Sequence, residues 1–241
     1  MILSMQRITL AALSLAALGI FAWPFFGLNI EPNLASWLGF GAVAILLLAS
    51  LGVLDGDLIG PKQIAMLAIL AALGSGIRVA TGGTGGFELV FITVILGGRA
   101  FGPRFGFLLG ASTIAVSSLF FGGFGPWTGY QMFATAWVGA GAGLLFGKQR
   151  RFENLLLAGY GVVASYIFGL LLNLWFWPVA TVSSSLAYDP DGMLFENITS
   201  FLSFSLLTST LSWDTVRAIS VGALLILFAR PALRALRRAK F

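Results

Sequence analysis

We predict that this chain is an all-α integral membrane protein, and three observations lead to that prediction. Of its 241 residues, 58% are hydrophobic and only 10% are charged, whereas soluble domains carry about 25% charged residues. Its mean hydropathy is +0.95. Long apolar segments follow one another with short polar connections. Because the chain has no long polar block, most of it must lie in lipid.

The first apolar segment, residues 8–26, follows Arg7 and has the general character of a secretion signal. However, no small-x-small cleavage site follows it, and the next residues read PFFGLNIEP before a second apolar run begins. Signal peptides end in such a cleavage site. We therefore interpret residues 8–26 as a retained transmembrane helix.

A helix needs about 20 mainly apolar residues to cross a bilayer. By this criterion the sequence predicts eight membrane segments, at residues 8–26, 35–54, 62–80, 87–98, 104–121, 128–147, 154–177 and 213–230. The long connection before the last segment ends in FLSFSLL, which predicts a re-entrant or surface helix over residues 197–208.

The fourth segment is too short to cross a membrane as a helix. Its dozen residues cover about 18 Å of a hydrocarbon core that is about 30 Å thick. The preceding stretch, Thr81–Gly86, must then supply non-helical backbone, which is tolerated at membrane depth only where protein buries it or it lines a cavity. The alternative is a loop at the membrane surface followed by a short tilted helix.

The basic residues predict the orientation. With the N-terminus inside, only Arg78 and Arg217 of the 14 basic residues lie outside. This positive-inside pattern predicts a multi-pass protein of the cell membrane with both termini in the cytoplasm. Two glycine-rich stretches, TGGTGGFE and FGGFGPWTGYQ, and the loop at 178–212 then face outward. The remaining basic residues lie on the cytoplasmic side: Arg7, Lys62, Arg99, Arg104, Lys148, Arg150, Arg151, Arg230, Arg234, Arg237, Arg238 and Lys240.

The composition excludes several kinds of chemistry. The chain has no Cys and no His, which excludes disulfides, thiol catalysis and the usual zinc or haem ligands. It has no Walker-type phosphate loop, so it cannot hydrolyse ATP itself. The predicted segments show no chain of buried Asp, Glu or Arg of the kind found in proton-coupled transporters. We therefore expect a binding component that is not an enzyme, has no cofactor and does not bind nucleic acid.

Polar and aromatic residues near the outward glycine-rich stretches predict a ligand pocket, since small-molecule sites combine apolar walls with a few convergent polar groups. Glycines let the backbone approach a ligand closely. Arg78 and Glu88 flank the first stretch and can pair with each other across the turn. One or both are expected to hold a polar ligand group; the alternative is a boundary salt bridge or side chains that snorkel to the interface. The predicted pocket comprises Arg78, Gly82, Gly83, Gly85, Gly86, Glu88, Trp127, Tyr130, Gln131 and Asn173.

The spacing of Trp127, Tyr130 and Gln131 predicts that they share one helix face. An interfacial aromatic belt explains Trp127 equally well. Gln131, one turn deeper, favours a pocket because a buried amide needs a hydrogen-bond partner. Asn173 is likewise an amide within an apolar helix. Asp214 is expected to cap the last helix or to pair with Arg217 at i+3.

Small residues repeat at helical spacing in three segments, and such surfaces let helices approach closely. Segment 62–80 carries Ala65, Ala68 and Ala72 on one face. Gly106 and Gly110 repeat the pattern in segment 104–121, and Gly139 and Gly143 repeat it in segment 128–147. The basic tail RPALRALRRAKF is expected to anchor on anionic lipid headgroups.

These features resemble the substrate-binding (S) component of an energy-coupling factor transporter. The resemblance covers residues 62–230 and rests on the alanine-rich segment 62–80, TGGTGGFELVFITVILGGRAFGPRFGFLLG, GPWTGYQMF and SWDTVRAI. GPWTGYQMF is most similar to members assigned to cobalamin uptake. The resemblance implies a six-helix core that captures a vitamin outside and topples within the bilayer to deliver it. It also implies docking to a transmembrane coupling protein with two ATPases, through Ala65, Ala68 and Ala72.

The resemblance divides the chain into two additional N-terminal helices (1–60), an S-component core (61–230) and a basic tail (231–241). It leaves the first two helices unexplained, and it does not assign individual ligand contacts. Two other classes stay open. Ion-coupled transport by the purified chain alone is expected of a self-sufficient secondary transporter or channel, and a dry, fully packed outer pocket is expected of a membrane scaffold without a ligand.

Overall fold

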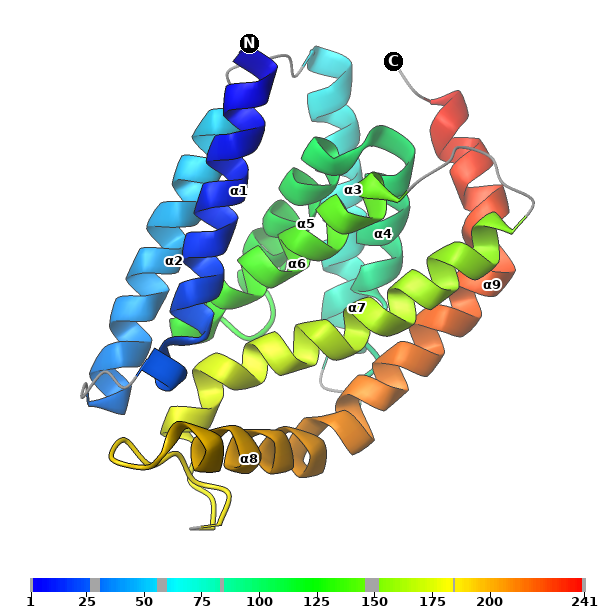
Figure 1. Ribbon diagram of the computed structural model, residues 1–241. Helices are drawn as coiled ribbons and strands as arrows, with labels where there is room; N and C mark the ends of the chain where they lie inside the picture. The colour runs from blue at the N-terminus through cyan, green and yellow to red at the C-terminus, as the bar shows by residue number, and fades with distance from the viewer. Residues whose placement is uncertain are drawn as a thin grey trace.

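The computed structural model describes residues 2–26, 31–55, 60–82, 85–145, 152–183 and 185–239. The described residues form helices and contain no strand (Figure 1). Their order is α1 (Ile2–Phe21), η1 (Trp23–Phe26), α2 (Pro32–Asp55), α3 (Pro61–Thr81), α4 (Val90–Phe101), α5 (Pro103–Ser118), α6 (Pro126–Leu144), α7 (Glu153–Phe176), η2 (Trp177–Val179), α8 (Leu194–Ser205), η3 (Leu206–Asp214) and α9 (Thr215–Arg238).

Three helical stretches are long and apolar enough to cross a membrane: Pro61–Thr81, Glu153–Val179 and Leu194–Arg238. They confirm the all-α membrane class, while the count of eight membrane segments stays a prediction. As expected from the sequence, α4 has only 12 residues, and the described residues of the stretch before it, from Gly82 to Leu89, are not helical.

The molecule has two distinct ends (Figure 1). Both chain termini lie at one end, which we call the terminal face. The connections α3–α4, α5–α6 and α7–α8 lie at the other end, which we call the loop face, and α8 runs across it. Proline begins α3, α5 and α6, where its missing N–H has no intrahelical partner to lose.

Glycines let α5 and α6 pack closely at the centre of the bundle. A Cβ atom on Gly106 would collide with the backbone of Gly139, and one on Gly110 would collide with the backbone at Thr135. Gly143 lies in the same way against Pro103. The small-residue patterns in α5 and α6 therefore serve packing inside the fold, which is the close helix approach that such patterns allow.

The last helix differs from the prediction at both of its ends. Helix runs without interruption from Leu194 to Arg238, so Asp214 does not begin a helix and makes no side-chain cap. The segment η3, over Leu206–Asp214, is a π-helix that joins α8 to α9. At the other end, α9 continues through Pro231 to Arg238, and Leu233 is fully buried. Part of the predicted basic tail is therefore packed helix.

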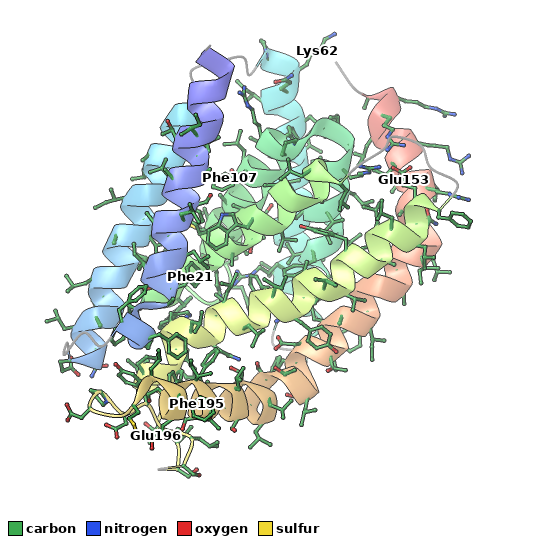
Figure 2. The ribbon with its side chains drawn as sticks, in the orientation of Figure 1. Phe21, Lys62, Phe107, Glu153, Phe195 and Glu196 are labelled. Atoms are coloured by element: carbon green, nitrogen blue, oxygen red, sulfur yellow. The ribbon has the colours of Figure 1, made fainter. Side chains whose placement is uncertain are left out.

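One carboxylate ties three helices together at the terminal face, where Figure 2 labels it. Glu153, at the start of α7, accepts a hydrogen bond from Arg99 Nε of α4 at 3.0 Å. It also accepts two from Arg237 of α9, at 2.6 and 3.1 Å. Arg99 additionally donates to the carbonyl of Leu145 at 2.6 Å. Because Glu153 is only 4% exposed, these partners satisfy a charge that burial would otherwise penalise.

Candidate functional site

The loop face brings together two polar clusters from residues far apart in the sequence. The first, the Arg78 cluster, consists of Arg78, Ser117, Gln131 and Phe121. The second, the Arg217 cluster, consists of Arg217, Glu88, Asp214, Ser209 and Asn173. Charged and amide side chains within membrane helices are costly unless they are paired or functional, so these clusters are the candidate site.

Arg78 lies in the last turn of α3 and is 9% exposed. Its Nη1 donates to Ser117 Oγ of α5 at 2.9 Å, and its Nη2 donates to Gln131 Oε1 of α6 at 2.9 Å. The ring of Phe121, from the α5–α6 connection, lies 5.5 Å from the guanidinium carbon. These two hydrogen bonds join a buried cation to neutral groups, and Arg78 makes no salt bridge with the described residues.

Glu88 pairs with Arg217 and not with Arg78, which corrects the pairing expected from the sequence. Arg217 Nε donates to Glu88 Oε2 at 2.5 Å. Arg217 Nη1 donates to Asp214 Oδ1 at 2.7 Å and to the carbonyl of Ser165 at 3.1 Å. The Asp214–Arg217 pair predicted at i+3 is thereby confirmed. The guanidinium also lies near two rings, Phe91 at 5.6 Å and Phe168 at 5.0 Å.

Asn173 of α7 joins this cluster through a serine that sequence reasoning missed. Its Nδ2 donates to Ser209 Oγ at 2.7 Å, and Ser209 Oγ donates to Asp214 Oδ2 at 3.0 Å. Ser209 and Asp214 are five residues apart, which is the hydrogen-bond spacing of a π-helix. An ordinary α-helical reading of this segment does not place them together, so the sequence carried no usable signal for Ser209.

Buried acidic and basic groups are therefore linked within the membrane bundle, contrary to the expectation from the sequence. Asp214 is 1% exposed and Arg217 is 5% exposed. The Asp214 carboxylate lies directly against Gly169 of α7, where a Cβ atom would collide with it. The sequence does not predict this three-residue arrangement, because Glu88, Asp214 and Arg217 lie at the ends of predicted segments and come together only in the fold.

The predicted common face of Trp127, Tyr130 and Gln131 is divided in the structure. Gln131 reaches Arg78, as described above. Tyr130 is fully buried; its ring lies 4.8 Å from that of Phe21 and 5.6 Å from that of Trp175. Trp127 is half-buried and folds back over Gly125. Adjacent residues project about 100° apart on a helix of 3.6 residues per turn, so Tyr130 and Gln131 contact different neighbours.

The glycine-rich connection α3–α4 approaches both clusters. Gly82 lies against the ring of Phe121, and a Cβ atom there would lie 2.5 Å from that ring. Gly86 adopts φ +92° and lies against the backbone of Trp213 in η3, a conformation that favours glycine. Gly85 also has positive φ. Gly83, the remaining glycine predicted to contact a ligand, lies outside the described residues.

Three cavities lie away from these clusters. One, about 820 Å³, lies between α1, the α4–α5 junction and α6. Another, about 340 Å³, lies between α1 and α2 and is lined almost entirely by apolar residues. A third, about 460 Å³, lies at the start of α3, around Gly60 and Lys62. No group of three or more His, Cys, Asp or Glu side chains that would suit a metal occurs in the described part of the chain.

The face of α3 with Ala65, Ala68 and Ala72 is exposed. The opposite face of α3, with Leu70, Gly74 and Ser75, packs against the bundle, and Ser75 Oγ donates to the carbonyl of Thr113 at 3.0 Å. The alanine face is thus available to a partner outside this chain. Comparisons with protein-family models, with curated proteins and with solved structures find no match for this chain.

Proposed function

We propose that this protein is the substrate-binding membrane component of an ATP-driven vitamin importer of the energy-coupling factor type, with cobalamin as the favoured ligand. It captures the vitamin at the loop face and releases it toward the cytoplasm. The observation that carries the proposal is the Arg78 cluster. A buried guanidinium with neutral hydrogen-bond partners is expensive in a membrane, and a ligand that needs it explains why it is kept.

The chemistry of the Arg78 cluster suits a ligand rich in hydrogen-bond acceptors. A guanidinium carries five N–H donors, and hydrogen bonds to Ser117 and Gln131 use two of them. The others are available to amide, carboxylate or phosphate oxygens. Phe121 lies beside the guanidinium, and Gly82 of the α3–α4 connection lies against the Phe121 ring. An aromatic ring and close backbone give the mixture of apolar wall and polar group that small-molecule sites use.

Orientation and partners follow from the same proposal. The distribution of basic residues supports an orientation with the loop face outside and both termini in the cytoplasm of a cell-membrane protein. The exposed face of Ala65, Ala68 and Ala72 receives a transmembrane coupling protein, because small side chains permit close helix approach. Separate ATPase subunits supply the energy, since this chain has no phosphate-binding loop of its own.

The decisive experiment is ligand identification with the purified full chain in detergent. Small molecules that co-purify are identified by mass spectrometry, and a panel of vitamins that includes cobalamin is tested by calorimetry. We expect one vitamin to bind with a 1:1 ratio and to raise the thermal unfolding temperature. If no vitamin of the panel binds or co-purifies, the proposal is wrong.

A second candidate function rests on the Arg217 cluster. Two carboxylates and a guanidinium linked within a membrane bundle are typical of proton relays in self-sufficient transporters. Reconstitution of the chain alone distinguishes the two functions. Uptake into proteoliposomes driven by a pH gradient and abolished by Glu88→Gln supports the self-sufficient transporter, whereas ligand binding without uptake supports the component of a larger importer.

A further inference from the structure

The cavity of about 820 Å³ at the terminal face is lined mainly by apolar residues. Arg104, in the first turn of α5, is the one charged residue of its lining. Apolar side chains form most of the remaining wall, among them Leu10 of α1, Phe107 of α5 and Leu144 of α6. Its volume lies in the range of sites that hold small molecules, roughly 300–1,000 Å³.

The Trp137 indole in the cavity wall has no N–H left to donate to an occupant. Trp137 Nε1 donates to Ser14 Oγ at 3.1 Å, so these two polar groups of the wall satisfy each other. From Trp137 to Leu144 the wall follows α6 for seven residues, or about 10 Å at 1.5 Å per residue. An occupant must therefore be elongated and apolar along the wall, with a polar group only at the Arg104 end.

The surroundings indicate the charge of that polar group. Besides Arg104, the terminal face carries Lys62, Arg234 and Arg238. Arg99 and Arg237 also lie there, where they share the Glu153 carboxylate. Such an excess of positive charge at one membrane surface attracts anionic lipid headgroups, and basic pockets between transmembrane helices bind them specifically.

We propose that this cavity is a binding site for an anionic phospholipid, with the phosphate at Arg104 and an acyl chain along Leu10, Trp137 and Leu144. The bound lipid fills the space between the N-terminal helix and the rest of the bundle. It gives α1 a role that is independent of the vitamin site. The site suits a membrane lipid better than free phosphate, because free phosphate would leave the apolar wall without an occupant.

Native mass spectrometry of the purified full chain, titrated with phosphatidylglycerol or with phosphatidylcholine of the same acyl chains, tests this proposal. We expect preferential retention of phosphatidylglycerol. Arg104→Gln should lower that retention about tenfold, because it removes a hydrogen bond to a charged group. Arg238→Gln makes the same change of charge at an exposed position of the terminal face outside the cavity, and it should leave retention as in the parent.

A second pair of variants tests the apolar wall without disturbing the core. Ala11 is exposed and lines the cavity, whereas Ala12 is exposed and does not. Ala11→Phe should lower retention of both lipids, and Ala12→Phe should not. Phosphatidylglycerol with a photoreactive acyl chain should label residues 10–14 and 137–144.

Three results overturn the proposal. One is an equal effect of Arg104→Gln and Arg238→Gln, which indicates diffuse surface attraction. Another is an equal effect of Ala11→Phe and Ala12→Phe. The third is labelling confined to other helices. If Arg104→Gln unfolds the protein, the comparison of Ala11→Phe with Ala12→Phe still tests the proposal, since both alanines are exposed.

Discussion

Arg217 and Glu88 are 129 residues apart in the sequence, and their side chains form an ion pair with a distance of 2.5 Å between Nε and Oε2. This pair joins α9 to the glycine-rich connection before α4. Arg217 also holds Asp214, so one guanidinium neutralises two carboxylates at the loop face. At the terminal face, Glu153 with Arg99 and Arg237 ties α4, α7 and α9 together.

The Arg217 cluster predicts an order of stabilities. Arg217→Leu should destabilise the protein by about 3–5 kcal/mol, because it leaves the buried Asp214 charge without its partner. Glu88→Gln should have a smaller effect, since the Glu88 side chain is 35% exposed and Arg217 keeps Asp214. Unfolding in mixed micelles measures the difference. The double variant Asp214→Leu/Arg217→Leu should regain part of the loss, and a further loss would contradict the pairing.

The Arg78 cluster predicts weaker vitamin binding when its hydrogen bonds are removed. Gln131→Ala should lower affinity about tenfold, in line with the loss of hydrogen bonds to a charged group. Trp127→Ala should lower it roughly thirtyfold if the indole packs on the ligand. Calorimetry on the purified chain measures both. Phe124→Ala is the control, because Phe124 lies in the same connection but is 60% exposed; parental affinity in both test variants would place the site elsewhere.

The exposed alanine face predicts a separation of binding from uptake. Ala68→Trp and Ala72→Trp should abolish uptake in cells that contain the coupling protein, while the isolated protein binds its ligand normally, because a bulky side chain blocks close helix approach. Leu73→Trp is the control, since Leu73 is exposed on the same helix and projects about 100° away from Ala72. Loss of binding and uptake together would argue that this face supports the fold instead.

The basic residues predict the topology. Reporter fusions after residue 149 and at the C-terminus should give cytoplasmic signals, and insertions near residues 124 and 190 should give external ones, as the positive-inside pattern requires. Alkaline phosphatase and green fluorescent protein fusions measure this in intact cells. Reversed signals would place the Arg78 cluster at the cytoplasmic side and contradict capture of an external vitamin.

The sequence by itself determined the helical membrane class and the approximate positions of the helices, including the short α4 and a helix near residues 197–208. Apolar length and helix-starting prolines are local properties that a sequence displays directly. It also identified Arg78, Gln131, Glu88 and Asn173 as polar residues in need of partners, because a buried polar group must be satisfied wherever it lies.

Only the tertiary structure decided which partners those residues meet. Glu88 binds Arg217 and Arg78 binds Gln131, and nothing in the spacing of residues so far apart distinguishes these pairs from the alternatives. Likewise, the glycines of α5 and α6 pack inside the bundle while the alanines of α3 stay exposed. Both patterns look alike in sequence, because helical periodicity shows that a face is small and the packing of neighbouring helices determines what covers it.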